Sequence, residues 1–80
     1  REQPFFLKSV FVNIGEGMLA NFLNDLLKAY PLLLLGSYPE FAHPDYKVKV
    51  TLESKDKDYL DQALTELLGK LPRGAVVKVQ

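Results

Sequence analysis

The side chains that could carry out chemistry are few and lie far apart in the sequence. His43 is the only histidine, and Asp45 is the carboxylate nearest to it. One imidazole and one carboxylate in a loop fall short of the ligand set that a protein metal site requires. The chain contains no cysteine, which excludes disulfides, thiol catalysis and cysteine-ligated zinc. We therefore expect His43 to be a solvent-exposed loop residue, and we expect no bound metal and no cofactor.

Nucleophilic catalysis also lacks its parts. The hydroxyl nucleophiles could come from Ser9, Ser37 or Ser54, but His43 is the one available base and no G-x-S-x-G motif is present. The sequence therefore predicts no catalytic residue. A small free-standing enzyme is the least favoured function, and it would need an essential role for His43, Asp45 or Arg73.

Two glycines could shape a phosphate-binding turn. Gly15 and Gly17 stand at the start of a predicted helix, where backbone N–H groups can bind an anion. Glu16 lies between them and would repel a phosphate, and no other part of a nucleotide-binding fingerprint is present. A tight connection between strand and helix is the favoured interpretation.

Size and charge narrow the class of protein. Eighty residues suit one domain, and ten basic side chains balance ten acidic ones. A net charge of zero disfavours nucleic acid as a partner, and no apolar run is long enough to span a membrane. The absence of cysteine fits a cytoplasmic location. Because the sequence begins with Arg1 and not Met, we expect residues 1–80 to be a single domain of a larger polypeptide.

Two apolar stripes with identical spacing predict two helices that each bury one face. The first helix is expected over residues 16–29, ended by Pro31, and the second from residue 56 to residue 68 or 71. The members of the first stripe are Met18, Leu19, Phe22, Leu23, Leu26, Leu27 and Tyr30. The members of the second stripe are Tyr59, Leu60, Ala63, Leu64, Leu67, Leu68 and Leu71.

Four segments are typical of strands, over residues 5–14, 32–35, 46–53 and 75–80. The short apolar run at 32–35 predicts a buried central strand, stopped by a turn at Gly36, Ser37, Tyr38 and Pro39. In the third segment, alternation puts Tyr46 on the buried face with the valines and leucine at every second position.

The order β-α-β-β-α-β predicts the α+β class and a ferredoxin-like sandwich. Right-handed crossovers would place both helices on one face of a four-stranded antiparallel sheet. The other face would then stay open, and alternation assigns it Phe11, Val76 and the lysines Lys47, Lys49 and Lys78.

An open face with aromatic and basic residues raises RNA binding as an alternative. RNA-recognition domains share this element order and stack bases on aromatic side chains of the open face. The segment 10–14 is similar to their first-strand motif, but the third strand presents lysines and a threonine where two aromatics are needed. RNA or a small ligand on this face is therefore the second hypothesis, after docking against another domain.

The segments from Gly36 to Pro39, from residue 46 to residue 52 and from Leu71 to Gly74 carry a family resemblance. The chain resembles the small α/β domain that follows the molybdopterin-binding-type domain in CinA-like proteins and eukaryotic-type FAD synthases. The likeness runs from about residue 5 to residue 79 and includes a Val-x-Val-Asn-Ile-x-Glu strand, matched by residues 10–16.

The resemblance implies a role inside a larger protein. Parent proteins of this type are linked to nucleotide or pterin chemistry, including pyrophosphatase activity on FAD or ADP-ribose, which the resemblance places in a neighbouring domain. For this chain it implies a non-catalytic accessory domain that acts in domain packing or dimer assembly. Its partners would be the neighbouring domain or a second copy. Gly36, Ser37, Tyr38 and Pro39 would contact that domain or its ligand.

Overall fold

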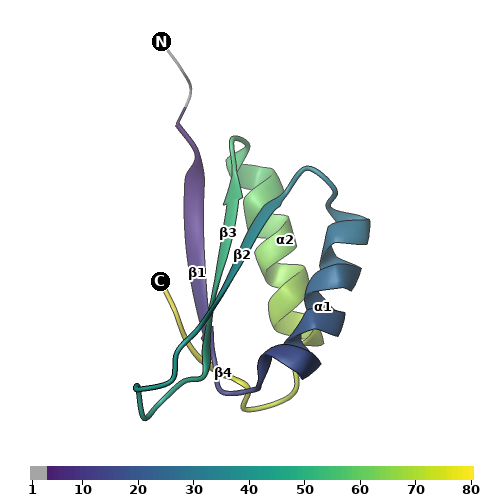
Figure 1. The fold of residues 1–80 in the computed structure, drawn as a ribbon. Helices are drawn as coiled ribbons and strands as arrows, with labels where there is room; N and C mark the ends of the chain where they lie inside the picture. Colours follow the sequence, from purple (N-terminus) through teal and green to yellow (C-terminus); the bar gives the residue numbers. More distant parts are fainter. Residues whose placement is uncertain (1–3) are drawn as a thin grey trace.

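The sheet has four antiparallel strands and is covered by helices on one face. The structure, a computed structural model, describes residues 4–80. Its elements are β1 (Phe6–Val12), α1 (Glu16–Ala29), β2 (Leu34–Pro39), β3 (Val48–Ser54), α2 (Lys57–Lys70) and β4 (Val76–Val79). The strand order is β2-β3-β1-β4, and Figure 1 shows α1 and α2 side by side against the same face. The predicted ferredoxin-like fold is confirmed, while residues 1–3 of the predicted domain lie outside the described residues.

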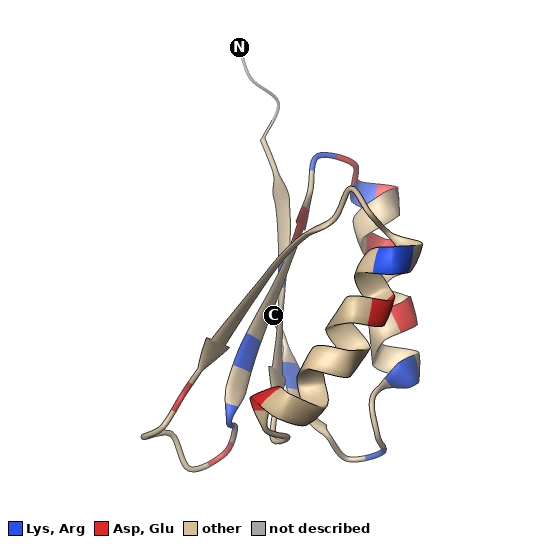
Figure 2. Cartoon of the chain, turned by 45° about the vertical axis from the view of Figure 1, so that its right-hand side comes forward, with Lys and Arg blue, Asp and Glu red and all other residues tan. Residues whose placement is uncertain are grey.

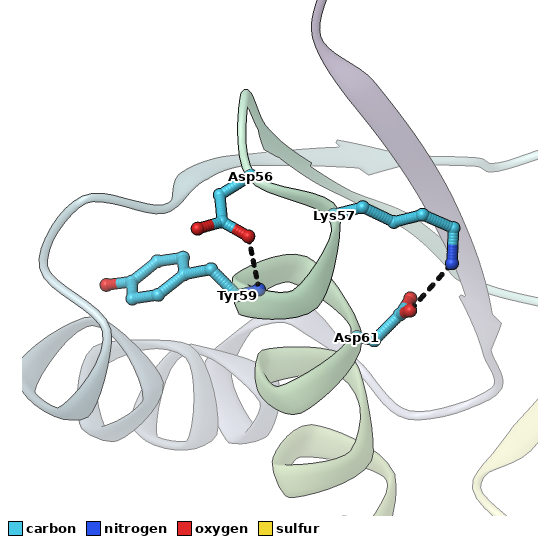
Figure 3. Close-up of polar contacts among 4 residues, drawn as sticks. All are labelled: Asp56, Lys57, Tyr59 and Asp61. Atoms are coloured by element: carbon cyan, nitrogen blue, oxygen red, sulfur yellow. Dashed lines mark hydrogen bonds and ion pairs between the residues drawn. The ribbon is translucent and has the colours of Figure 1, made fainter.

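The helix ends follow local signals in the sequence. α1 begins at Glu16, whose negative charge suits the first turn, and it ends before Pro31. α2 is capped by Asp56, whose carboxylate accepts a hydrogen bond from the backbone N–H of Tyr59 at 3.1 Å (Figure 3). Gly69 lies inside α2, so the helix continues to Lys70, two residues before Pro72.

The core lies between the two layers and is made of aliphatic side chains. The sheet and the helices contribute the fully buried side chains Val10, Val12, Val48, Val50, Leu52, Leu19, Leu26, Leu60, Ala63 and Leu67. Each predicted stripe is wider than the face it buries, because Met18, Leu27 and Leu68 at the stripe margins are exposed. A helix that rests on a single sheet buries only the centre of its apolar stripe.

The prediction for β2 was wrong in the residues that form the strand and in the location of the strand within the sheet. The strand is Leu34–Pro39, so the segment predicted as a turn is the strand itself, and it lies at the edge of the sheet. Leu32, predicted to be buried, is 79% exposed. The pairing of Leu34 with Glu53 through Pro39 with Val48 explains the shift: backbone hydrogen bonds with β3 hold this segment, and an edge strand tolerates proline.

Two further side chains lie on the face opposite to the one predicted. The pairing of β4 with β1 shifts register between Phe11 and Val12, so Val76 stands opposite Val12 and packs against the core. Tyr46 precedes the first residue of β3 and its ring contacts Phe11, away from the core. Alternation holds only inside a regular ladder, and both residues fall where the ladder is interrupted or has not begun.

Candidate functional site

The face of the sheet opposite the helices, called the uncovered face below, carries a row of four large side chains. The register pairs Tyr38 with Lys49, Lys49 with Phe11, and Phe11 with Lys78. The row therefore crosses β2, β3, β1 and β4 in order and alternates aromatic ring and cation. Neighbouring strands lie about 4.8 Å apart, so these side chains are within reach of one another.

Phe11 is the centre of this row. The Nζ atoms of Lys78 and Lys49 lie 4.8 Å and 5.8 Å from the centroid of its ring. The ring of Tyr46 meets it edge-on at 4.9 Å, and the ring of His43 lies 4.5 Å from that of Tyr46. Phe11 is consequently only 6% exposed, although no helix covers it. The predicted neighbours Lys49 and Lys78 are present, but the ring is not available as a bare stacking platform.

Lys47, the third lysine assigned to this face, takes no part in the row. Its side chain is exposed, and its backbone N–H donates a 2.8 Å hydrogen bond to the carbonyl of Val12. Figure 2 shows basic positions along β3 and β4, at the end of the sheet near the 40–47 loop. Of the residues that alternation assigned to this face, the structure brings together Phe11, Lys49 and Lys78.

A hollow of about 420 Å³ adjoins the row. Leu7, Tyr38, Lys49, Thr51 and Glu53 line it. Thr51, in the middle of the lining, pairs with Gly36 on β2 and with Ser9 on β1, so small residues flank it on both neighbouring strands. Sequence reasoning missed this hollow, because its lining residues come from three strands and are brought together only by the strand register.

Gly36 and Tyr38 form one unit within the uncovered face. A Cβ atom on Gly36 would lie 2.6 Å from Oγ1 of Thr51 and 2.7 Å from the Cε2 and hydroxyl oxygen of Tyr38. The tyrosine ring therefore lies over the glycine, as aromatic side chains do beside edge-strand glycines. The absence of a side chain at residue 36 is what leaves room for the Tyr38 ring.

The four residues Gly36, Ser37, Tyr38 and Pro39 do not form a single site. Strand alternation sends Ser37 to the helix side, where its hydroxyl donates a 3.4 Å hydrogen bond to Oε2 of Glu16. A second hollow, of about 360 Å³, lies there between α1 and β2. The segment thus contributes to two surfaces, one on each face of the sheet.

The other predicted candidates have local structural contacts. His43 Nδ1 accepts a 3.1 Å hydrogen bond from the backbone N–H of Asp45, which is local loop geometry. Residues 4–80 contain no group of three or more histidine, aspartate and glutamate side chains that could hold a metal ion. Gly15 is the N-cap of α1 in an extended conformation, so it serves the connection between β1 and the helix.

A second surface is apolar and lies where β1 begins. Phe5, Leu7, Leu32 and Leu34 are between 46% and 79% exposed. A hollow of about 370 Å³ is lined by Phe5, Leu32 and Leu34 together with Ser54, Lys55, Asp56 and Tyr59. The Tyr59 hydroxyl accepts a 3.1 Å hydrogen bond from the backbone N–H of Leu32, which holds the connection before β2 against α2. We call Phe5, Leu7, Leu32 and Leu34 the apolar end.

Comparison with known families supports one part of the resemblance raised by the sequence. The family described as "FAD synthase, middle domain" matches residues 4–80. The chain belongs to the FAD synthase middle-domain family. The FAD synthase part of the predicted resemblance is thereby confirmed, while the link to CinA-like and molybdopterin-binding-type proteins stays a prediction. In residues 4–80 of this middle domain, none of the helices has the length and apolar character needed to cross a membrane.

Proposed function

We propose that this chain is a non-catalytic accessory domain of an FAD-synthase-like protein and that its apolar end packs against a neighbouring domain. Family membership supports the accessory role, because the family is described as a middle domain of a larger enzyme. Catalysis, including any pyrophosphatase activity of a CinA-like or molybdopterin-binding-type parent, would then belong to the neighbour.

The apolar end is the observation that carries the packing role. A domain of this size usually exposes large aliphatic side chains singly, whereas Phe5, Leu32 and Leu34 line one hollow together, with Leu7 beside them. Phe5 and Leu7 also belong to the segment through which the chain enters β1. A domain tethered ahead of β1 would therefore be held beside this surface at high effective concentration.

The proposal is tested by hydrogen exchange in the full-length parent protein and in the isolated chain. The amides of residues 5–7 and 32–34 are expected to exchange more slowly in the parent. The double variant Leu32→Glu/Leu34→Glu should remove this difference, because buried unpaired carboxylates oppose docking. Phe41→Glu is the matched control, since Phe41 is 95% exposed and lies outside the apolar end.

Three outcomes would contradict the proposal. Equal exchange in the parent and in the isolated chain would mean that the apolar end has no intramolecular partner. Protection that rises with the concentration of the isolated chain would point to a second copy as the partner, and so to dimer assembly. Hydrolysis of FAD or ADP-ribose by the isolated chain at the rate of the parent would refute the non-catalytic role.

A further inference from the structure

We propose that the uncovered face binds a small organic phosphate that carries a flat ring, with the phosphate at Lys49 and Lys78 and the ring in the hollow beside Tyr38. This site adjoins the apolar end, with which it shares Leu7, but its lysines and Tyr38 lie outside that end, and it goes beyond the packing role proposed above. Three observations carry it: the lysine pair over Phe11, the lining of the hollow, and the distribution of charge on the face.

The lysine pair supplies the anion site. The two ammonium groups come from strands on either side of β1, and both lie over the ring of Phe11. Within residues 4–80, neither Lys49 nor Lys78 forms a salt bridge with a carboxylate. Both ammonium groups are thus gathered at one aromatic ring, and each has three N–H donors that can turn toward one anion bound beside that ring. A phosphate there would also relieve the repulsion between the two like charges.

The hollow supplies the site for the rest of the ligand. Tyr38 provides an aromatic wall and Leu7 an apolar one, and both are about half exposed. The hydroxyls of Tyr38 and Thr51 both lie close to Gly36, and Glu53 lies at the end away from the lysines. A flat ring can stack on Tyr38, and amino or hydroxyl groups on it can donate to Glu53. Lys49 borders both the hollow and the anion site, which joins them into one surface.

The charge on this face favours a small ligand over a nucleic-acid strand. A single strand needs a basic groove that follows its backbone over several nucleotides. Here Glu53 follows Lys49 on the same face of β3, so the basic part of the surface is confined to one end of the hollow. The chain as a whole carries no net charge, so it gives a polyanion little long-range attraction.

The test is a titration of the labelled 80-residue chain followed by amide NMR shifts. AMP serves as the probe, adenosine lacks the phosphate, and inorganic phosphate lacks the ring. AMP is expected to shift the amides of Tyr38, Lys49, Thr51 and Lys78, with adenosine and phosphate each at least about tenfold weaker. Tyr38→Ala should weaken AMP but leave the affinity for phosphate unchanged.

Charge-matched variants separate the site from general electrostatics. Lys49→Gln/Lys78→Gln should weaken AMP by about tenfold or more, whereas Lys28→Gln/Lys70→Gln, which removes the same charge from the helices, should leave it within about twofold. Equal loss in the two double variants, or no shift with AMP at millimolar concentration, would overturn the proposal. Tighter binding of single-stranded RNA than of AMP by more than about a hundredfold would replace it with an RNA-binding surface.

Discussion

The two faces of the sheet differ in chemistry although they are built from the same strands. Along β3, Val48, Val50 and Leu52 face the helices and are fully buried, while the residues between them, Lys49, Thr51 and Glu53, are polar and partly exposed. The covered face supplies most of the hydrophobic stabilisation, since apolar burial is the main favourable term in folding. The uncovered face contributes less to stability, and its side chains can therefore be specified by recognition.

Phe11 shows that the contrast between the faces is not simply one of burial. It is nearly as inaccessible as the core valines, yet its neighbours on this face are the ammonium groups of Lys49 and Lys78 and the ring of Tyr46. Amphipathic side chains can bury an aromatic ring while they keep their charges in water. On the uncovered face, charged side chains thus surround a buried ring, whereas the buried part of the covered face is almost entirely aliphatic.

The largest test of this contrast compares one leucine from each environment. Leu67 on α2 is fully buried against the covered face, and Leu34 on β2 is 51% exposed on the uncovered face. Leu67→Ala is expected to lower the free energy of unfolding by about 2–5 kcal/mol through lost transfer energy and the cavity left behind. Leu34→Ala should cost less than about 1 kcal/mol, measured by urea denaturation. Equal losses would show that the uncovered face is as important to stability as the core.

How far the sequence predicts the structure can be seen in the same elements. The helices follow from their stripes and from Asp56 and Pro31, because periodicity and capping are local signals. The fold follows from the element order, because few topologies allow right-handed crossovers between such elements. The position of β2 does not follow, because its pairing with β3 depends on backbone contacts that leave no apolar pattern at Gly36 and Ser37.

The candidate sites were less accessible to prediction than the fold. Phe11, Lys49 and Lys78 were assigned to one face by alternation, and the structure places them there. The burial of Phe11 and the hollow beside Tyr38 depend on which residues are opposite one another across strands. Strand register depends on residues that are far apart in the sequence, so local patterns in a single sequence do not predict it.

The second prediction tests the uncovered face by adding volume instead of removing it. Gly36→Ala would place a Cβ atom within 2.6 Å of Thr51 and 2.7 Å of Tyr38, so both side chains must move. We expect a loss of about 1–2 kcal/mol in unfolding free energy, measured by thermal and urea denaturation. The double variant Gly36→Ala/Tyr38→Ala should recover part of the loss, relative to Tyr38→Ala alone. No recovery would mean that the strain lies against Thr51 or in the backbone.

The third prediction concerns the N-cap of α2, one of the two helices on the covered face. Asp56→Ala removes the acceptor for the backbone N–H of Tyr59 and should cost about 1 kcal/mol. Asp56→Asn keeps the acceptor and is the matched control, with a smaller loss expected. Amide exchange should quicken in the first turn of α2 and stay unchanged on the uncovered face. A change that spread to β4 would contradict the separation of the two faces.

The smallest effect is expected on the solvent side of α2, where neither face of the sheet is involved. Lys57 donates a 2.8 Å hydrogen bond to Oδ2 of Asp61, and this bond together with the attraction of the carboxylate raises the pKa of Lys57 above its ordinary value of 10.5 (Figure 3). A raised lysine pKa stabilises the folded chain fully below the ordinary value, and the contribution disappears as the pH rises through the folded pKa. Because both side chains are exposed, the contribution is small and screened by salt. The stability difference between the wild type and Lys57→Gln should therefore be larger at about pH 9 than at about pH 11.5, when it is measured by urea denaturation at low salt.

Lys28→Gln is the control for the loss of one exposed charge, since the Nζ of Lys28 is 4.0 Å from Asp25. If the stability difference between the wild type and Lys57→Gln grew with pH, its sign would be opposite to that expected for a stabilised ammonium group. That result would show that Asp61 does not stabilise the charged form of Lys57 in the folded state.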